Sequence, residues 1–200
     1  MTQYVYQPLD ESKNEIRLIT LLPAADRDSV VICDLNIVRL TKEDVPRYEA
    51  LSYTWGSAES PIKLRVSSEN EHSIDITRNL AEALPYLRDP ISPRILWIDS
   101  IAINQKDLEE RGQQVQRMAD IYSLAESVVV WLGMDDANSR IAMEICEFLG
   151  TKIEVEFEGE LETLRSLTTQ PDDAHWGDIR ESLPYDLATW QAIVDFLRRP

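Results

Sequence analysis

Cysteine and glycine are scarce in this sequence of 200 residues. There are two cysteines, Cys33 and Cys146, and six glycines. Two distant cysteines within apolar stretches exclude a disulfide framework and predict buried thiols in a reducing compartment, and His72 and His175 are too few to complete a zinc site. The glycines form neither a G-x-G-x-x-G loop nor a Walker loop, and no G-x-S-x-G motif occurs, so neither a glycine-loop nucleotide site nor a serine hydrolase is expected.

Basic residues and long apolar runs are also scarce. Lys and Arg number 20 against 36 Asp and Glu, which gives a formal charge of −16. Such a surface repels phosphate backbones and anionic lipid, so no nucleic acid and no membrane is expected as a partner. No stretch approaches the roughly 18 uncharged apolar residues of a membrane span, and the start lacks the pattern of a signal peptide. These features predict a cytoplasmic protein.

Alternating apolar strands and amphipathic helices predict an α/β fold with an open sheet. The first two strands are joined by a short polar connector and should form an antiparallel pair, whereas the later strand–helix–strand order predicts parallel core strands. The nearly all-apolar run 94–99 and the run 127–133 are expected to be buried strands. The expected strands are 15–23, 30–40, 48–56, 62–67, 72–77, 94–99 and 127–133. The expected helices are 79–89, one opening at Asp107, 135–150 and 187–200.

Helix-capping signals support these helices. Asn79 with Glu82 three residues later, and Asp107 with Glu110, each match a capping box. Val115 with Met118 and Tyr122 is expected to form the buried face of the second helix, and Ile141, Ile145 and Phe148 that of the third.

The organisation along the chain predicts one domain with additions at both ends. Residues 1–47 form a β extension, 48–150 the core, and 151–200 an acidic excursion followed by a helix of the same domain. The acidic excursion contains the run 154–162, in which five of nine residues are Glu.

The polar loop 99–111 follows an apolar strand, at the edge where open parallel sheets bind ligands. Asp99 could accept from a ribose hydroxyl, orient a catalytic group, or cap the amides of its own loop. Asn104 could offer its amide to a ligand or form an Asx turn. Arg111 opposes the helix dipole, which favours an ion pair with Asp99 or Asp107, or an anionic ligand.

The strand 48–56 supplies a second set of candidate ligand-binding residues. Ser52, Tyr53 and Trp55 lie near its carboxyl end, and Gly56 ends it. Tyr53 and Trp55 fall on one face by alternation and could sandwich a flat ring. The alternative is two core aromatics followed by a turn glycine.

Three segments together resemble the heterokaryon-incompatibility (HET) domain of filamentous fungi. They are "YEALSYTWG", "NLAEAL" and "LWIDSIAINQKDLEERGQQVQRMADIYSLAESVVVWLG". The resemblance covers residues 15–150 and departs at Ala102, where the family commonly has Cys. It implies a role in fungal allorecognition, innate immunity and programmed cell death, and a flavodoxin-like or TIR-like sheet in which 48–56, 94–99 and 127–133 are the first three strands.

The likeness to TIR domains also implies an activity. Some TIR domains cleave NAD through a glutamate on a helix after the third or fourth strand, so Glu144 and Glu147 are the candidate catalytic residues, with solvated surface charge as the alternative. NAD is then a substrate, and no cofactor is expected. The family normally continues past a segment like 196–200 into a Trp-rich stretch ending in Gln-Glu, which is a further candidate. The other open function is a non-catalytic module that self-associates or binds another signalling protein.

Overall fold

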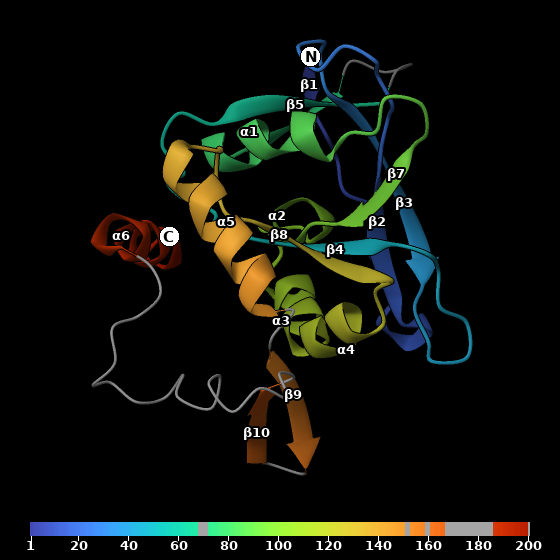
Figure 1. The fold of residues 1–200 in the computed structure, drawn as a ribbon. Helices are drawn as coiled ribbons and strands as arrows, with labels where there is room; N and C mark the ends of the chain where they lie inside the picture. The colour runs from blue at the N-terminus through green and yellow to red at the C-terminus, as the bar shows by residue number, and fades with distance from the viewer. Residues whose placement is uncertain (68–71, 151–152, 159–160, 167–185, 200) are drawn as a thin grey trace. The chain divides into compact units, whose positions relative to one another are not determined.

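The computed structural model describes residues 1–67, 72–150, 153–158, 161–166 and 186–199 (Figure 1). The chain divides into two compact units, Met1–Met134 and Asp135–Pro200, and each is described by itself. The predicted division into 1–47, 48–150 and 151–200 stays a prediction.

The first unit is built on one mixed sheet. In the described residues its strand order is β1-β6-β5-β3-β2-β7-β4-β8. The strands are β1 Thr2–Gln3, β2 Glu15–Leu21, β3 Ile32–Arg39, β4 Glu49–Tyr53, β5 Ile62–Val66, β6 His72–Ile76, β7 Arg94–Trp97 and β8 Ser127–Trp131. The α/β class predicted from the sequence is confirmed.

The antiparallel pair predicted at the start of the chain is confirmed as β2 and β3. Glu15 pairs with Arg39 at one end and Leu21 with Cys33 at the other. The predicted hairpin forms as well, since β5 and β6 are antiparallel. β2 continues the sheet by pairing antiparallel with β7.

The parallel core consists of β7, β4 and β8. β4 lies between the other two and pairs parallel with both. The first of these strands in the chain is therefore the middle one, as it is in the first three strands of a flavodoxin-like sheet. Because the three strands are parallel, their carboxyl ends meet at one edge of the sheet.

β8 differs from its prediction, which placed it as a buried strand. It is the outermost strand of the sheet in the described part of the chain, and Val128 and Val130 are 46% and 57% exposed. The apolar run reflects β-branched residues that suit a strand, and such a run alone does not distinguish a central strand from an edge.

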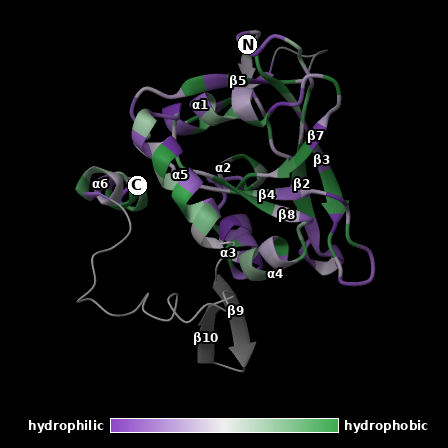
Figure 2. Cartoon of the chain, in the orientation of Figure 1, coloured by the Kyte–Doolittle hydropathy of each residue, from purple (hydrophilic) through white to green (hydrophobic). Residues whose placement is uncertain are grey.

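Helices of the first unit lie between these strands. They are the 3₁₀ turn η1 Glu11–Lys13, then α1 Arg78–Leu87, α2 Asp99–Ala102, α3 Leu108–Gln116 and α4 Met118–Ser123. The single helix predicted from Asp107 is two helices, because the helix is interrupted at Arg117, which is the C-cap of α3 and the N-cap of α4. The Arg117 guanidinium donates to the carbonyl oxygens of Glu15 and Leu40. Val115, predicted to be buried, is consequently on the surface, and α3 is mostly hydrophilic (Figure 2).

A single large core holds the first unit together. It includes residues from the parallel strands β4 and β7 and from the antiparallel pair: Trp97, Leu96, Ile98 and Leu51 are fully buried with Ile16 and Ile19, and Val129 and Trp131 of β8 pack against it partly buried. Cys33 is buried as predicted, and this burial raises the pKa of its thiol to about 12.

The described residues of the second unit form two helices and an antiparallel pair of strands. They are α5 Ala137–Gly150, the antiparallel strands β9 Ile153–Glu158 and β10 Leu161–Ser166, and α6 Leu187–Leu197. The hairpin falls in the predicted excursion, where the alternation Ile-Glu-Val-Glu-Phe-Glu was the signal for a strand. Residues 167–185 of that excursion lie outside the described residues. None of the helices in the described ranges is long and apolar enough to cross a membrane.

The packing of α5 corrects two predictions. Among its described residues the buried apolar positions are Ala142 and Ile145, which pack with Ile193 of α6, so the prediction for Ile145 is confirmed. Ile141 and Phe148, expected on the buried face, are exposed, and so is Cys146, expected to be a buried thiol. The face of α5 that contacts the neighbouring helix is therefore the one that carries Ala142 and Ile145.

Candidate functional site

Side chains from four segments meet at the carboxyl ends of the parallel strands. We call these residues the strand-end cluster: Tyr53 at the end of β4 with Trp55 in the loop after it, Asn79 on α1, Asp99 and Ser100 after β7, and Trp131 at the end of β8. Three hydrogen bonds join them in pairs across distances of 44 to 52 positions in the sequence. This is the edge at which an open α/β sheet binds its ligand.

Asp99 is the carboxylate of the strand-end cluster. Its Oδ2 accepts from Nε1 of Trp55 at 2.9 Å, and its Oδ1 accepts from the backbone N–H of Ser100 at 2.7 Å. Burial raises the pKa of Asp99, and these two hydrogen bonds oppose the rise. A carboxylate has about four acceptor positions, so Asp99 can accept further hydroxyl or amide donors.

The two aromatic residues of β4 and the following loop have different environments. Tyr53 is half-buried and packs against the core, and its hydroxyl lies 2.6 Å from Oγ of Ser100. Trp55 lies beyond the end of β4 and is 41% exposed. Tyr53 is thus a core aromatic, whereas Trp55 offers its indole to solvent while Asp99 fixes its orientation.

Asn79 has a role that the sequence did not indicate. Its prediction as the N-cap was wrong, because α1 begins at Arg78 and the N-cap is Thr77, which makes no side-chain capping bond. Asn79 instead donates to the carbonyl oxygen of Thr54 and accepts from Nε1 of Trp131 at 3.0 Å. Gly56, with φ +71°, brings the loop past this residue, since a Cβ there would lie 3.8 Å from Cβ of Asn79. The capping signal accounted for Asn79 fully, so nothing pointed to its contact with the strand ends.

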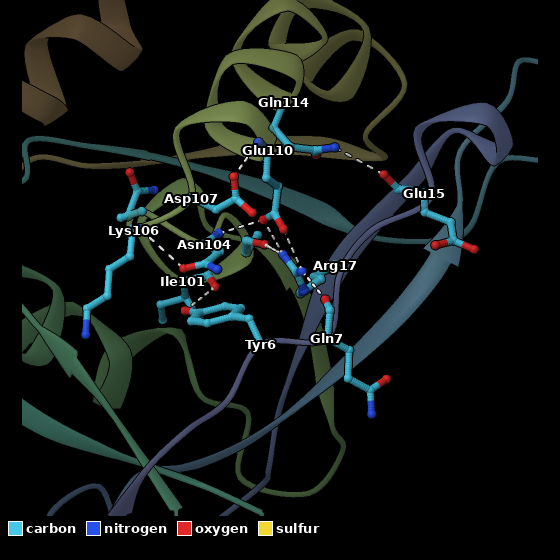
Figure 3. Close-up of polar contacts among 12 residues, drawn as sticks. Tyr6, Gln7, Glu15, Arg17, Ile101, Asn104, Lys106, Asp107, Glu110 and Gln114 are labelled. Atoms are coloured by element: carbon cyan, nitrogen blue, oxygen red, sulfur yellow. Dashed lines mark hydrogen bonds and ion pairs between the residues drawn. The ribbon is translucent and has the colours of Figure 1, made fainter.

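A buried ion pair fixes the 99–111 loop to β2 (Figure 3). Arg17 donates to Oε1 and Oε2 of Glu110 at 2.5 and 2.9 Å, and both side chains are buried. Oε1 of Glu110 also accepts from the backbone N–H of Asn104 at 2.7 Å. Arg17 donates in addition to the carbonyl oxygen of Ala102. Glu110, predicted to close a capping box, is therefore an internal anchor.

Capping of α3 is carried by Asp107 alone. Its Oδ1 accepts from the backbone N–H groups of Glu109 and Glu110. The predicted N-cap is thus confirmed, and α3 begins at Leu108, the next residue.

The N-terminal segment closes over the same loop. The hydroxyl of Tyr6 donates to the carbonyl oxygen of Ile101 at 2.9 Å, and the Arg17 guanidinium lies 5.0 Å from the Tyr6 ring. Arg17 also donates to the carbonyl oxygen of Gln7. The buried Arg17 on β2 therefore contacts both the N-terminal segment, at Tyr6 and Gln7, and the loop that ends at Glu110.

The side-chain amides of Asn104 and Gln105 each use one of their two polar atoms in a hydrogen bond within the loop. Oδ1 of Asn104 accepts from the backbone N–H of Lys106 at 3.3 Å, which is the expected Asx turn, and Nε2 of Gln105 donates to the carbonyl oxygen of Asp99 at 3.0 Å. Arg111 is exposed and forms no ion pair with Asp99 or Asp107. Ser52 is half-buried within β4.

The candidate glutamates lie in the second unit. Glu144 and Glu147 are both exposed on α5, and because the two units are described separately, their assignment as catalytic residues stays a prediction. Within the described residues, no group of three His, Cys, Asp or Glu side chains is arranged to hold a metal ion.

The fold places the protein in the α/β class, with an open sheet that carries a polar and aromatic cluster at the ends of its parallel strands. The family profile described as "Heterokaryon incompatibility protein (HET)" matches residues 48–191. The chain therefore belongs to the HET family, as the sequence motifs indicated.

A curated fungal relative supports this membership. Over 166 residues the chain is 34% identical to "Heterokaryon incompatibility protein 6, OR allele" of Neurospora crassa. The match covers 74% of this chain and 24% of that protein, so the chain spans about a quarter of this relative's length. No solved structure matches the chain.

Proposed function

We propose that this chain acts in fungal allorecognition and regulated cell death as a TIR-like effector that binds NAD at the strand-end cluster and cleaves it. The observation that carries the proposal is Asp99. It is a carboxylate at the carboxyl end of β7, its orientation is fixed by Trp55, and it has acceptor positions left for the hydroxyls of a ribose.

The proposed reaction breaks the bond between C1′ of ribose and the nicotinamide nitrogen. The bonding electrons leave with neutral nicotinamide, the oxygen of a water molecule bonds to C1′, and one proton is released, giving ADP-ribose. The ribosyl centre becomes oxocarbenium-like, so a nearby carboxylate lowers the barrier by electrostatic stabilisation. In this proposal Asp99 binds the ribose. The candidates for the glutamate that supplies the stabilising charge are Glu144, Glu147 and the glutamate of the family's Trp-rich segment.

The test is loss of NAD with equal release of nicotinamide by the purified chain at high concentration. Asp99→Ala is expected to raise KM at least tenfold, because the ribose loses its acceptor, and Glu144→Gln or Glu147→Gln to abolish kcat. Glu109→Gln, an exposed glutamate outside the cluster, is the control. A form extended through the family's Trp-rich segment runs beside them. Turnover by the extended form alone would place the glutamate in that segment, and no turnover by any form, even when clustered artificially, would exclude the NAD-cleaving activity.

A second function is supported by β8. Its outermost position in the described sheet and its exposed Val128 and Val130 suit pairing with another strand. A non-catalytic module that self-associates through this edge, or binds another signalling protein there, accounts for the same fold without turnover. It predicts concentration-dependent association that Val130→Lys abolishes, with NAD unchanged.

A further inference from the structure

A cavity of about 340 Å³ lies beside the strand-end cluster. We call it the strap cavity, because the N-terminal segment forms one of its walls. The second wall is the loop that follows β7, and the third is β6. It is lined by Gln3, Tyr4, Val5, Tyr6, Ile74, Asp75, Ser100, Asn104, Gln105 and Lys106. Its volume is at the lower end of the range for small-molecule sites.

The strap cavity adjoins the strand-end cluster through consecutive residues. Ser100 lines the cavity and lies 2.6 Å from the Tyr53 hydroxyl, and Asp99 precedes it in the chain. One ligand can therefore contact Asp99 with one part and occupy the cavity with another.

The loop wall is rigid. Glu110 holds the backbone of Asn104, Arg17 holds Ala102, and Tyr6 holds Ile101 (Figure 3). Rigid polar groups discriminate between ligands because little ordering is required when the ligand binds.

Two adjacent amides leave a complementary pair of groups. Asn104 uses its Oδ1 within the loop, which leaves the Nδ2 donors, and Gln105 uses its Nε2, which leaves the Oε1 acceptor. Both residues line the cavity, so it has an amide donor and an amide acceptor to offer to a ring that carries an acceptor and an amino group, the groups by which an asparagine or glutamine amide recognises adenine. A ring carboxamide presents the same pair.

The charges at the cavity suit an anionic group attached to that ring. Lys106 forms no ion pair with any described residue, and Figure 3 shows its side chain directed away from the Arg17–Glu110 pair. The neighbouring carboxylate, Asp75, is compensated by Lys63 at 2.5 Å. In a chain of net charge −16, an uncompensated lysine at a cavity is a site for phosphate.

We propose that the strap cavity binds the ring of a nucleotide, a planar nitrogen heterocycle with a donor beside an acceptor, and that Lys106 contacts its phosphate. The inference rests on the proposed function in that Asp99 takes the ribose of the same molecule. Residues 3–6, which precede the matched range 48–191, thereby become part of the ligand site.

The test measures binding to the full chain without turnover. The probes are AMP and nicotinamide mononucleotide, which carry the two rings of NAD, with ribose 5-phosphate as the probe that lacks a ring. Amide NMR of the wild-type chain is expected to show shifts confined to residues 3–6 and 99–106 with one or both nucleotides. Ribose 5-phosphate, which lacks the ring, should shift residues 99–106 at most and leave residues 3–6 unchanged.

Two variants separate ring from phosphate. Asn104→Asp removes the Nδ2 donors but keeps the Asx acceptor, and should weaken nucleotide binding at least tenfold, whereas Asn36→Asp on β3 adds the same charge and should not. Lys106→Gln should weaken binding of the nucleotide but not of its nucleoside, with the exposed Lys42→Gln as its control.

The inference is overturned if neither nucleotide binds at millimolar concentration, if the shifts lie elsewhere, or if Asn104→Asp and Asn36→Asp behave alike. Its failure is distinguishable from that of the proposed function. Nucleotide binding at the cavity without NAD loss supports the inference alone, and NAD loss with binding elsewhere supports the function alone.

Discussion

Arg17 and Glu110 are the two residues on which the candidate site depends most. Each is almost fully buried, at 1% and 7% side-chain exposure, and together they hold the backbone of the 99–111 loop. A buried ion pair contributes little over an apolar pair, but removing one partner leaves an uncompensated charge in the interior. The loop geometry is therefore sensitive to either substitution.

Glu110→Gln is expected to lower the free energy of unfolding by about 3 to 5 kcal/mol, because Arg17 remains buried without a counter-charge. Urea unfolding followed by circular dichroism measures the change. Glu109→Gln, one residue earlier on the solvent side of α3, should stay within about 0.5 kcal/mol of the wild type. Equal losses in the two variants would show that Glu110 does not anchor the loop.

The role of a residue could be predicted from the sequence when its hydrogen-bond partner lies within a few positions of it along the chain. Asp107 could be predicted as an N-cap because its partners lie two and three residues away. Glu110 matched the same local signal, but its partner Arg17 is 93 positions distant. The prediction of Asn79 as a helix cap was wrong for the same reason, since its partner Trp131 is 52 positions away. Asp99 was left with several roles, and the structure shows it bonded to Trp55 and to its own loop.

At the scale of elements, one carboxylate joins the starts of three parallel strands. Glu49 on β4 accepts from Arg94 on β7 and from Oγ of Ser127 on β8. The Arg94 guanidinium, with a smaller effect from Ser127, holds the pKa of Glu49 below its ordinary value of 4.5, although partial burial opposes this. Folding therefore favours the ionised carboxyl.

The sign of the pH dependence follows from the lowered pKa. Glu49 contributes stability at pH above its unfolded pKa, and this contribution is lost as the pH falls through the lower pKa of the folded state. Glu49→Gln should thus be less stable than wild type by about 1 kcal/mol at pH 7, with a difference that shrinks below about pH 4.5. Urea midpoints at pH 7 and pH 3.5 test this, with exposed Glu43→Gln as the control. A constant difference across that range would contradict it.

The elements themselves could be predicted to different degrees. The strands β2 to β8 could be predicted because each is rich in apolar residues and bounded by polar or turn residues. The two-residue strand β1 was not predicted, since Thr2–Gln3 carries no apolar pattern. Whether such a run lies at the centre or edge depends on which strands pair beside it, so the exposure of β8 was not predictable. The interruption between α3 and α4 lies at Arg117, whose guanidinium donates to the carbonyl oxygens of Glu15 at the start of β2 and of Leu40 just after β3. These are again tertiary contacts, which a local pattern does not predict.

At the scale of the whole molecule, the two units differ greatly in the size of their cores. The first contains a large buried cluster that reaches from Ile16 to Ile121. In the second, the buried cluster among the described residues is Ala142, Ile145 and Ile193. Buried apolar area is the main stabilising term in folding, so the described part of the second unit contributes much the smaller stabilisation.

Amide hydrogen exchange is therefore expected to separate the two units. Amides in β2, β4 and β7 should exchange only through global unfolding, and those in α5 and α6 through local opening at rates at least a hundredfold higher. Mass spectrometry of peptides from each element measures this, and Ile145→Ala is the informative variant. It should accelerate exchange in α5 and α6 while leaving β2 and β4 unchanged, whereas Leu51→Ala should accelerate exchange in the sheet. If Ile145→Ala destabilised the sheet to the same extent, the two units would unfold as one, and the candidate glutamates on α5 would share the stability of the strand-end cluster.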